Sequence, residues 1–315
     1  MENTRRNFFK KGLVGAVTLG AASLARPATA LSTTTQAPRA KRIVLISLDG
    51  ICVEGYLKAK TPHLDALMGE GSLSLETRVV MPSVTLPNWT SHLTGSGPEQ
   101  HGVVDNSWEI SKFTLPAVEK DAKGYYPSVF KVLKEAIPTV KTAFYYNWIN
   151  LFYPYNKQYF DEVSYLEKDA YIPNYEKAFA FLKANRNHPT LVFLYSVHTD
   201  HAGHAHKWMS PEYIQSIEEA DVEIGKFIDR MKQEGLYDDT HFLFLTDHGG
   251  INYGHGGVST DEMIVPWGIT GPGIKKGFKI KEANNTVNTA ATILHLFKVK
   301  QPLCWTGEVI RSIFK

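Results

Sequence analysis

The sequence has little cysteine and no long apolar run. With two cysteines among 315 residues, disulfides cannot be the main support of the fold. Cys52 and Cys304 could pair in an oxidising compartment, or both could remain free thiols. The most apolar stretch, residues 12–25, is too short to span a bilayer and is diluted with glycine. A transmembrane anchor is therefore not expected.

The chain also lacks a basic excess once its first residues are set aside. The formal net charge is +2, but residues 1–30 hold five basic residues and one acidic residue, so the remainder carries about −2. A protein that binds nucleic acid through its charge needs a basic face. We therefore predict no nucleic-acid-binding patch, and we expect a small-molecule substrate instead.

The first 30 residues have the layout of an export signal. Arg5-Arg6 precedes Phe8-Phe9-Lys10, a weakly apolar run follows, and Ala28-Thr29-Ala30 forms an A-x-A cleavage site. No cysteine follows the run, so a lipoprotein anchor is not supported. We predict a Tat-type signal peptide over 1–30, a linker over 31–40 and one catalytic domain over 41–315. The protein should use the Tat export machinery, become periplasmic or secreted, and have no membrane anchor after cleavage.

The remainder of the chain alternates between strand and helix patterns. Helices are expected from Thr61-Pro62, from Ser210-Pro211 and over 287–297, and a helix should also begin at Pro87. Continuous apolar runs of strand length indicate strands buried on both faces. These runs cover residues 42–48, 139–146, 190–197, 241–246 and 265–270, and residues 73–81 form a further β-branched segment. This alternation predicts an α/β fold with a mostly parallel central sheet and helices on both faces.

Carboxylates follow three of these strands. Asp49 ends the first strand, Asp200 comes just after the 190–197 strand, and Asp247-His248 ends the 241–246 strand. His204 and His255 follow in the adjoining loops. Because the carboxyl ends of parallel strands meet at one edge of the sheet, these side chains should converge. Unpaired carboxylates brought together would repel and lose solvation, so a cation is the natural compensation.

Thr85 adds a hydroxyl at a strand-to-helix junction, where helix amides can face an anion. Together with the three aspartates and three histidines it makes seven donors, which suit two metal ions rather than one tetrahedral ion. Mixed imidazole and carboxylate donors favour two Zn²⁺ ions, or another divalent transition metal. Three aspartates against two such ions leave a net charge of about +1, which suits a phosphate group.

Several short motifs resemble the nucleotide pyrophosphatase/phosphodiesterase branch of the alkaline phosphatase superfamily. They occur in family order and include Leu45–Gly50, Pro82–Asn88, His101–Asn106, Asp200 with Gly203-His204, Thr246–Gly249 and Gly254–Gly257. The resemblance implies an alkaline-phosphatase-like fold and a two-zinc hydrolase that works through a phosphothreonine on Thr85. It implies that Asp49, Thr85, Asp247 and His248 hold one ion, and that Asp200, His204 and His255 hold the other. It also implies that Asn106 and the backbone amide after Thr85 donate to phosphate oxygens.

Other readings of the same residues remain open. The site could serve a phosphomonoesterase or phosphonate hydrolase, although no arginine lies beside Thr85 to grip a doubly charged monoester. A third possibility is a metal-binding protein without turnover. Such a protein would lack a metal ligand or the nucleophile, and none of these residues is missing here. The family's sulfatase relatives need a Cys or Ser followed by x-P-x-R, which is absent here.

Two further clusters have no assigned role. His198, His201 and His206 could support the ligands, contact the substrate or simply be solvated. Nine aromatic residues between Phe144 and Phe160 could form a wall for a leaving group, or could be a buried strand with a packed loop.

Overall fold

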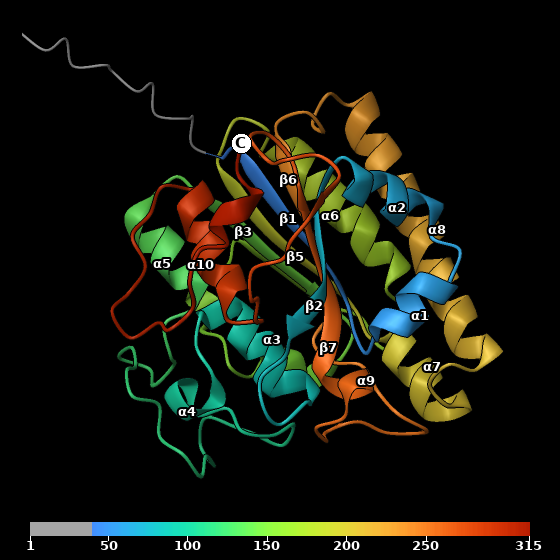
Figure 1. Cartoon of the computed structure of the whole chain (residues 1–315). Coiled ribbons are helices and arrows are strands. Elements are labelled where there is room, and N and C mark those ends of the chain that lie inside the picture. The colour runs from blue at the N-terminus through green and yellow to red at the C-terminus, as the bar shows by residue number, and fades with distance from the viewer. Residues whose placement is uncertain (1–39) are drawn as a thin grey trace, which may run out of the picture. The chain divides into compact units, whose positions relative to one another are not determined.

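The computed structural model describes residues 40–315. The predicted signal peptide and residues 31–39 of the predicted linker lie outside the described residues. Helices and strands alternate through the described part, as expected for an α/β fold (Figure 1). None of the helices in residues 40–315 combines the length and apolar character needed to cross a membrane.

A single eight-stranded sheet forms the centre, in the order β4-β3-β5-β1-β6-β7-β2-β8. Strands β4, β3, β5, β1 and β6 run parallel, β7 is antiparallel to both of its neighbours, and β8 is parallel to β2. The strands are β1 (Arg42–Leu48), β2 (Gly71–Arg78), β3 (Lys141–Tyr146), β4 (Glu162–Tyr165), β5 (Thr190–Ser196), β6 (Thr240–Leu245), β7 (Ile264–Thr270) and β8 (Phe278–Lys279). The mostly parallel sheet is confirmed.

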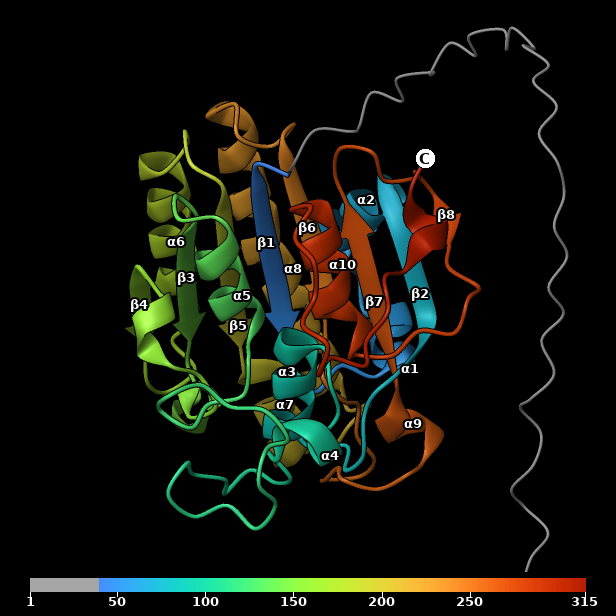
Figure 2. The ribbon, with the colours of Figure 1, turned by 90° about the vertical axis from the view of Figure 1, so that its left-hand side faces the viewer.

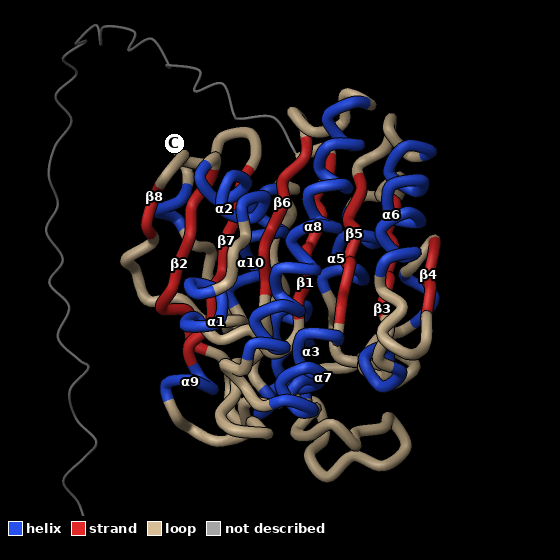
Figure 3. The backbone as a smooth tube through the Cα atoms, turned by 90° about the vertical axis from the view of Figure 1, so that its right-hand side faces the viewer, coloured by secondary structure: helices blue, strands red, loops and turns tan. Residues whose placement is uncertain are grey.

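Helices cover both faces of this sheet. The α-helices are α1 (Val53–Lys58), α2 (Pro62–Gly69), α3 (Thr85–Thr94), α4 (Pro98–His101), α5 (Val129–Ala136), α6 (Ile172–Ala184), α7 (His198–His206), α8 (Pro211–Gln233), α9 (Thr260–Met263) and α10 (Asn288–Leu296). Short 3₁₀ helices span Ile149–Phe152, Lys157–Tyr159 and Arg311–Ile313. Figure 2 looks onto the face with α3, α5 and α10, and Figure 3 onto the opposite face with α2, α6 and α8.

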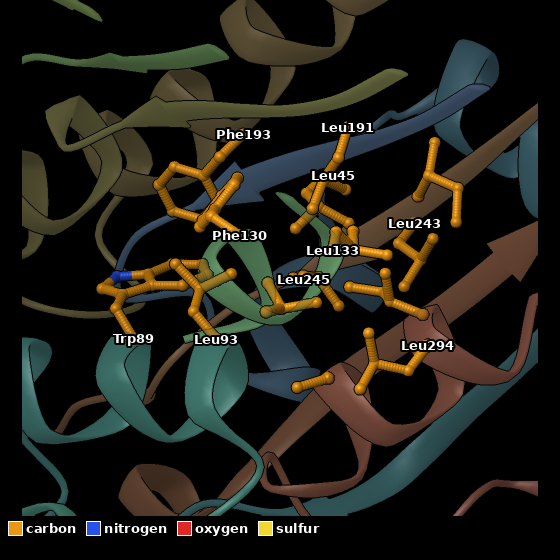
Figure 4. Close-up of a cluster of buried hydrophobic side chains, with 14 of the residues drawn as sticks. Leu45, Trp89, Leu93, Phe130, Leu133, Leu191, Phe193, Leu243, Leu245 and Leu294 are labelled. Carbon is orange, nitrogen blue, oxygen red and sulfur yellow. The ribbon is translucent and has the colours of Figure 1, made fainter. Parts of the chain in front are cut away.

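Each face of the sheet has its own hydrophobic core, because the strands alternate their side chains between the two sides. On one face, Leu45 of β1 and Phe193 of β5 pack with Trp89 and Leu93 of α3 and Leu294 of α10 (Figure 4). The other core joins the sheet to α1, α2, α6 and α8. Strand β1 is buried along its whole length, which accounts for its unbroken apolar sequence.

Local signals place most element ends correctly, with small corrections. The Ser210 hydroxyl accepts from the Tyr213 amide at the start of α8, as a cap should. Thr61 precedes α2, but its side chain makes no capping bond and donates to Asp65 instead. Helix α3 begins at Thr85 rather than at Pro87. Cys52 and Cys304 are both free.

Candidate active site

The predicted donors meet at the carboxyl edge of the central strands. Strands β5, β1 and β6 are neighbours, so the segments that follow them are neighbours too. Asp49 follows β1, Asp200 lies in the first turn of α7 after β5, and Asp247-His248 follows β6. Strand β2 ends at the same edge, because β7 reverses direction between β6 and β2. The chain after β2 therefore brings Thr85 to the same place.

The first group of donors surrounds one ring nitrogen of His248. Its Nε2 lies 3.2 Å from the Thr85 Oγ1, 3.3 Å from an Asp49 oxygen and 3.2 Å from an Asp247 oxygen. Asp49, Asp247 and His248 have no exposed side-chain surface, and Thr85 is 5% exposed. Four donor atoms from three segments thus face one buried point.

The second group is built on Asp200. One carboxylate oxygen of Asp200 lies 3.5 Å from the His204 Nε2, and the other lies 3.6 Å from the His255 Nε2. Ligand atoms of Asp200, His204 and His255 all fall within 4.8 Å of one another, and so do those of Asp49, Asp200 and His248. The His248 and His255 rings stack with centroids 3.7 Å apart. The two groups are therefore adjacent, with Asp200 beside both.

All three histidines present the same nitrogen to the site. The Nδ1 atoms of His204, His248 and His255 lie 2.8, 2.8 and 3.0 Å from the backbone oxygens of Tyr253, Gly249 and Ser83. A carbonyl can only accept, so each Nδ1 carries a proton, which leaves Nε2 as the atom through which the neutral ring can bind a metal ion. This is the tautomer that a metal ligand needs.

The carboxylates lack the partners that burial demands. One carboxylate oxygen of each of Asp49, Asp200 and Asp247 is buried without a hydrogen-bond partner. Those of Asp49 and Asp247 face the His248 Nε2, and that of Asp200 faces the His255 Nε2. Burial, then the charge of Asp200, raises the pKa of Asp49 to about 8. Burial also raises the pKa of Asp200 to about 7 and lifts the pKa of Asp247 well above its usual range. Bound cations would supply the missing partners, so the residues fit metal ions.

Two aromatic residues that the sequence does not single out hold Asp49 in place. Its second oxygen accepts from the Tyr195 hydroxyl and, at 3.2 Å, from the Trp89 indole nitrogen. The Trp89 and Tyr195 rings meet edge to face. These donors leave the first oxygen of Asp49 directed at His248.

The turn before Thr85 is fixed by two buried polar side chains. The Asn88 carbonyl accepts from the Val80 amide at 2.8 Å, and its amino group donates to three carbonyls of residues 80–84. The Ser83 hydroxyl donates to the Gly257 carbonyl at 2.7 Å and accepts from the Gly256 amide at 3.1 Å. Ser83 thereby joins the Thr85 turn to the loop that carries His255. No pattern in the sequence marks this role.

Asn106 lies beside the start of α3, where it bonds to the residue after Thr85. The Leu86 amide donates to the Asn106 side-chain oxygen at 2.8 Å. That amide, expected to donate to a phosphate oxygen, is therefore used within the protein. The bond leaves the Asn106 amino group as the donor that can face a substrate.

The histidines next to Asp200 divide into structural and exposed groups. His198 is buried, stacks on Tyr171 at 4.0 Å and bonds to the Ser216 carbonyl. It packs α7 against its neighbours and is not solvated. His201 is about half exposed and its Nδ1 lies 2.6 Å from an Asp169 oxygen, while His206 is exposed.

The aromatic run between Phe144 and Phe160 belongs mostly to the core. Of its nine aromatic residues, Tyr153 alone is exposed. Phe144 lies at the centre, with its ring stacked on Phe193 at 4.5 Å. The buried alternative therefore explains this run.

Comparison with known proteins identifies the family of the chain. Residues 43–288 match the family described as type I phosphodiesterase / nucleotide pyrophosphatase. An uncharacterised pyrophosphatase/phosphodiesterase of Schizosaccharomyces pombe is 27% identical over 229 residues, which cover 66% of this chain and 44% of that protein. Ectonucleotide pyrophosphatase/phosphodiesterase family member 3 of Mus musculus is 28% identical over 221 residues, 66% of this chain and 24% of the relative. The match thus spans less than half the length of these relatives.

Solved structures show the same fold. Murine ectonucleotide pyrophosphatase/phosphodiesterase 5, an inactive variant in complex with AMP, superposes with a TM-score of 0.74 at 15% identity, covering 88% of this chain and all of that one. A phosphonate monoester hydrolase from Silicibacter pomeroyi gives 0.62 at 17% identity, covering 87% and 76%. The family match covers most of the chain, so this protein belongs to the type I phosphodiesterase / nucleotide pyrophosphatase family of the alkaline phosphatase superfamily.

Proposed function

We propose that the protein is a two-zinc phosphodiesterase, similar to nucleotide pyrophosphatases, that acts through a phosphothreonine on Thr85. The observation that carries this proposal is the pair of adjacent donor groups around a buried threonine hydroxyl. Asp49, Thr85, Asp247 and His248 would hold one ion, and Asp200, His204 and His255 the other. Zn²⁺ suits this mixture of imidazole and carboxylate donors, and another divalent transition metal could replace it.

When bound, the ions would supply charge that acidifies the Thr85 hydroxyl and neutralises the phosphate. The Thr85 oxygen, at the first position of α3, attacks phosphorus in line while the bond to the leaving oxygen breaks. The Asn106 amino group donates to a non-bridging oxygen as charge develops there. Water then attacks the phosphothreonine, which returns the Thr85 hydroxyl and releases a phosphate monoester.

The residues around Thr85 favour a diester over a monoester. None of residues 80–90 is lysine or arginine, so the segment that carries the proposed nucleophile supplies no permanent cation for the second negative charge of a monoester. Asn106, a neutral donor, suits the single charge of a diester. A phosphomonoesterase or phosphonate hydrolase built on the same site is the alternative.

Paired aryl phosphate substrates provide the test. The purified protein should contain about two zinc ions per chain and hydrolyse the aryl diester faster than the matching monoester. EDTA should abolish the activity, and Zn²⁺ should restore it. Less than one ion per chain together with EDTA-resistant turnover would rule the proposal out.

We also propose export through the twin-arginine route, which the Arg5-Arg6 pair supports. Cleavage before Leu31 should then be visible as a shortened chain in the periplasm or medium. Replacing both arginines by lysine should retain the full-length chain in the cytoplasm. An unchanged distribution of the double variant would contradict this route.

A further inference from the structure

Trp208 lies in the link between α7 and α8 and contacts the segments that carry both groups of donors. Its side chain is 2% exposed. Its indole nitrogen donates to the Gly50 carbonyl at 2.9 Å, one residue after Asp49. Its backbone amide donates to the Asn252 carbonyl at 2.7 Å, in the loop that leads to His255.

The indole also borders two imidazoles of the second donor group. The ring centroids of Trp208 and His204 are 5.0 Å apart at 86°, and those of Trp208 and His255 are 5.9 Å apart at 64°. These are edge-to-face arrangements, which hold aromatic rings in a preferred orientation. The ring therefore limits how both histidines can turn.

Two glycines allow the indole to come this close. A methyl group built on Gly203, next to His204, or on Gly250, in the loop after β6, would overlap the Trp208 ring. The backbones of α7 and of the β6 loop are thus both in direct contact with the same side chain. The spacing between His204 and His255 depends on its size.

We propose that Trp208 is a positioning residue for the second metal ion, the one held by Asp200, His204 and His255. This inference depends on the two-ion site proposed above. Trp208 orients His204 and His255 through ring contacts, and it fixes the chain beside Asp49 through the bond to Gly50. Groups that orient metal ligands typically change metal affinity by about 10- to 100-fold when they are removed.

The test measures how readily each ion leaves the zinc-loaded protein. Wild type, Trp208→Leu and Trp208→Phe are equilibrated with rising EDTA, and the zinc that each chain retains is measured by mass spectrometry. Trp305→Leu is the matched control. Like Trp208, Trp305 is buried (5% exposed), donates its indole N–H to a carbonyl, that of Pro127, and packs on a glycine, Gly95. It lies at the end of α3 opposite to Thr85. His204→Gln, which lacks a donor of the second group, shows what the loss of that ion looks like.

Wild type and Trp305→Leu should release their ions at the same EDTA concentrations. Trp208→Leu should release one ion, as His204→Gln does, at an EDTA concentration about tenfold or more lower. Trp208→Phe keeps an aromatic ring but loses the hydrogen bond to Gly50, so the EDTA concentration at which it releases the ion should fall by less. Because this variant disturbs the packing less, it provides the measurement if Trp208→Leu fails to fold.

The outcomes separate the two proposals. If wild type holds two ions and both Trp208 variants release them as wild type does, the positioning role is wrong. If wild type itself holds fewer than two ions per chain, the two-ion site is wrong. If Trp208 only contributed to general packing, its variants and Trp305→Leu would lose melting temperature alike, and no variant of Trp208 would release one ion selectively. That result too would overturn the positioning role.

Discussion

At the residue scale, Thr85 combines burial with a fixed environment. Its hydroxyl lies 3.2 Å from the His248 Nε2, and the same nitrogen lies within 3.3 Å of oxygens of Asp49 and Asp247. The turn that precedes it is held by Ser83 and Asn88. The oxygen therefore occupies a defined position before any substrate arrives, which the proposed role as nucleophile requires.

Replacing Thr85 tests this role directly. Thr85→Ala should lower kcat for an aryl diester by at least about a thousandfold, because no other side-chain oxygen takes the place of the nucleophile. Thr85→Ser should keep a measurable part of the activity, since it loses only the methyl group that restrains the rotamer. Steady-state kinetics and trapping of a phosphorylated chain measure both effects. Turnover of Thr85→Ala at the wild-type rate would favour direct attack by water.

Single residues also show how far a sequence can predict such a site. Asp49, Asp200 and Asp247 could be predicted because each follows a strand of one parallel sheet, and topology alone brings such residues together. Trp208, Tyr195 and Ser83 could not be predicted in the same way. Their roles depend on contacts with residues far away in the chain, and buried aromatic or serine residues are common for other reasons.

At the element scale, the start of α3 depends on a side chain one turn into the helix. Asn88 lies inside α3 and bonds backward to residues 80–84, so the helix can begin at Thr85 although the Val84 side chain makes no cap. The sequence suggests Pro87 as the start, because proline is favoured in a first turn. Thr85 and Leu86 are added to the helix by the Asn88 hydrogen bonds, which local helix propensity does not predict.

Replacing Asn88 should loosen this element. Asn88→Ala removes four hydrogen bonds and leaves the Val80 amide without its acceptor, which should cost about 2 to 4 kcal/mol of unfolding free energy. Asn88→Asp should be at least as harmful, because its carboxylate would face three carbonyl oxygens. Urea unfolding measures both.

Asn185→Ala supplies the comparison for Asn88. Asn185 donates one bond to the Phe181 carbonyl at the end of α6, so its loss should cost only about 1 kcal/mol. Equal stability of Asn88→Asp and wild type would show that the turn before Thr85 is held by other contacts.

The sequence predicts the long strands but neither the short strands β4 and β8 nor helix α6. Long apolar runs mark β1, β5 and β6, whereas the direction of β7 leaves no trace in its own sequence. Its antiparallel pairing is nevertheless what returns β2 to the edge where Thr85 is needed. Such pairing is a property of the sheet as a whole rather than of one segment.

At the scale of the whole molecule, buried histidines should make stability depend on pH. His101 is 1% exposed, its Nδ1 accepts from the Val103 amide and its Nε2 lies 3.0 Å from the Ser91 hydroxyl. Burial lowers the pKa of His101 to about 3, whereas an unfolded histidine has a pKa of about 6.5. Protonating Nδ1 would place a hydrogen against the Val103 N–H.

The sign of the effect follows from the protons bound. Between pH 6.5 and 3 the unfolded chain binds a proton at His101 and the folded chain does not, so acid favours unfolding. The contribution of neutral His101 is complete above pH 6.5 and is lost as the pH falls toward 3. At pH 5 the loss should be about 2 kcal/mol relative to pH 7.

A variant isolates this contribution from that of the other titrating groups. His101→Asn can keep an acceptor for the Val103 amide but cannot bind the proton, so it should be less stable than wild type at pH 7 and lose less stability on acidification. The difference in unfolding free energy between wild type and His101→Asn should narrow by about 2 kcal/mol from pH 7 to pH 5, as measured by urea unfolding in EDTA. His188→Asn, at an exposed position, should parallel wild type throughout. A difference between wild type and His101→Asn that stays constant with pH would mean that His101 is protonated in the folded protein as readily as in the unfolded chain.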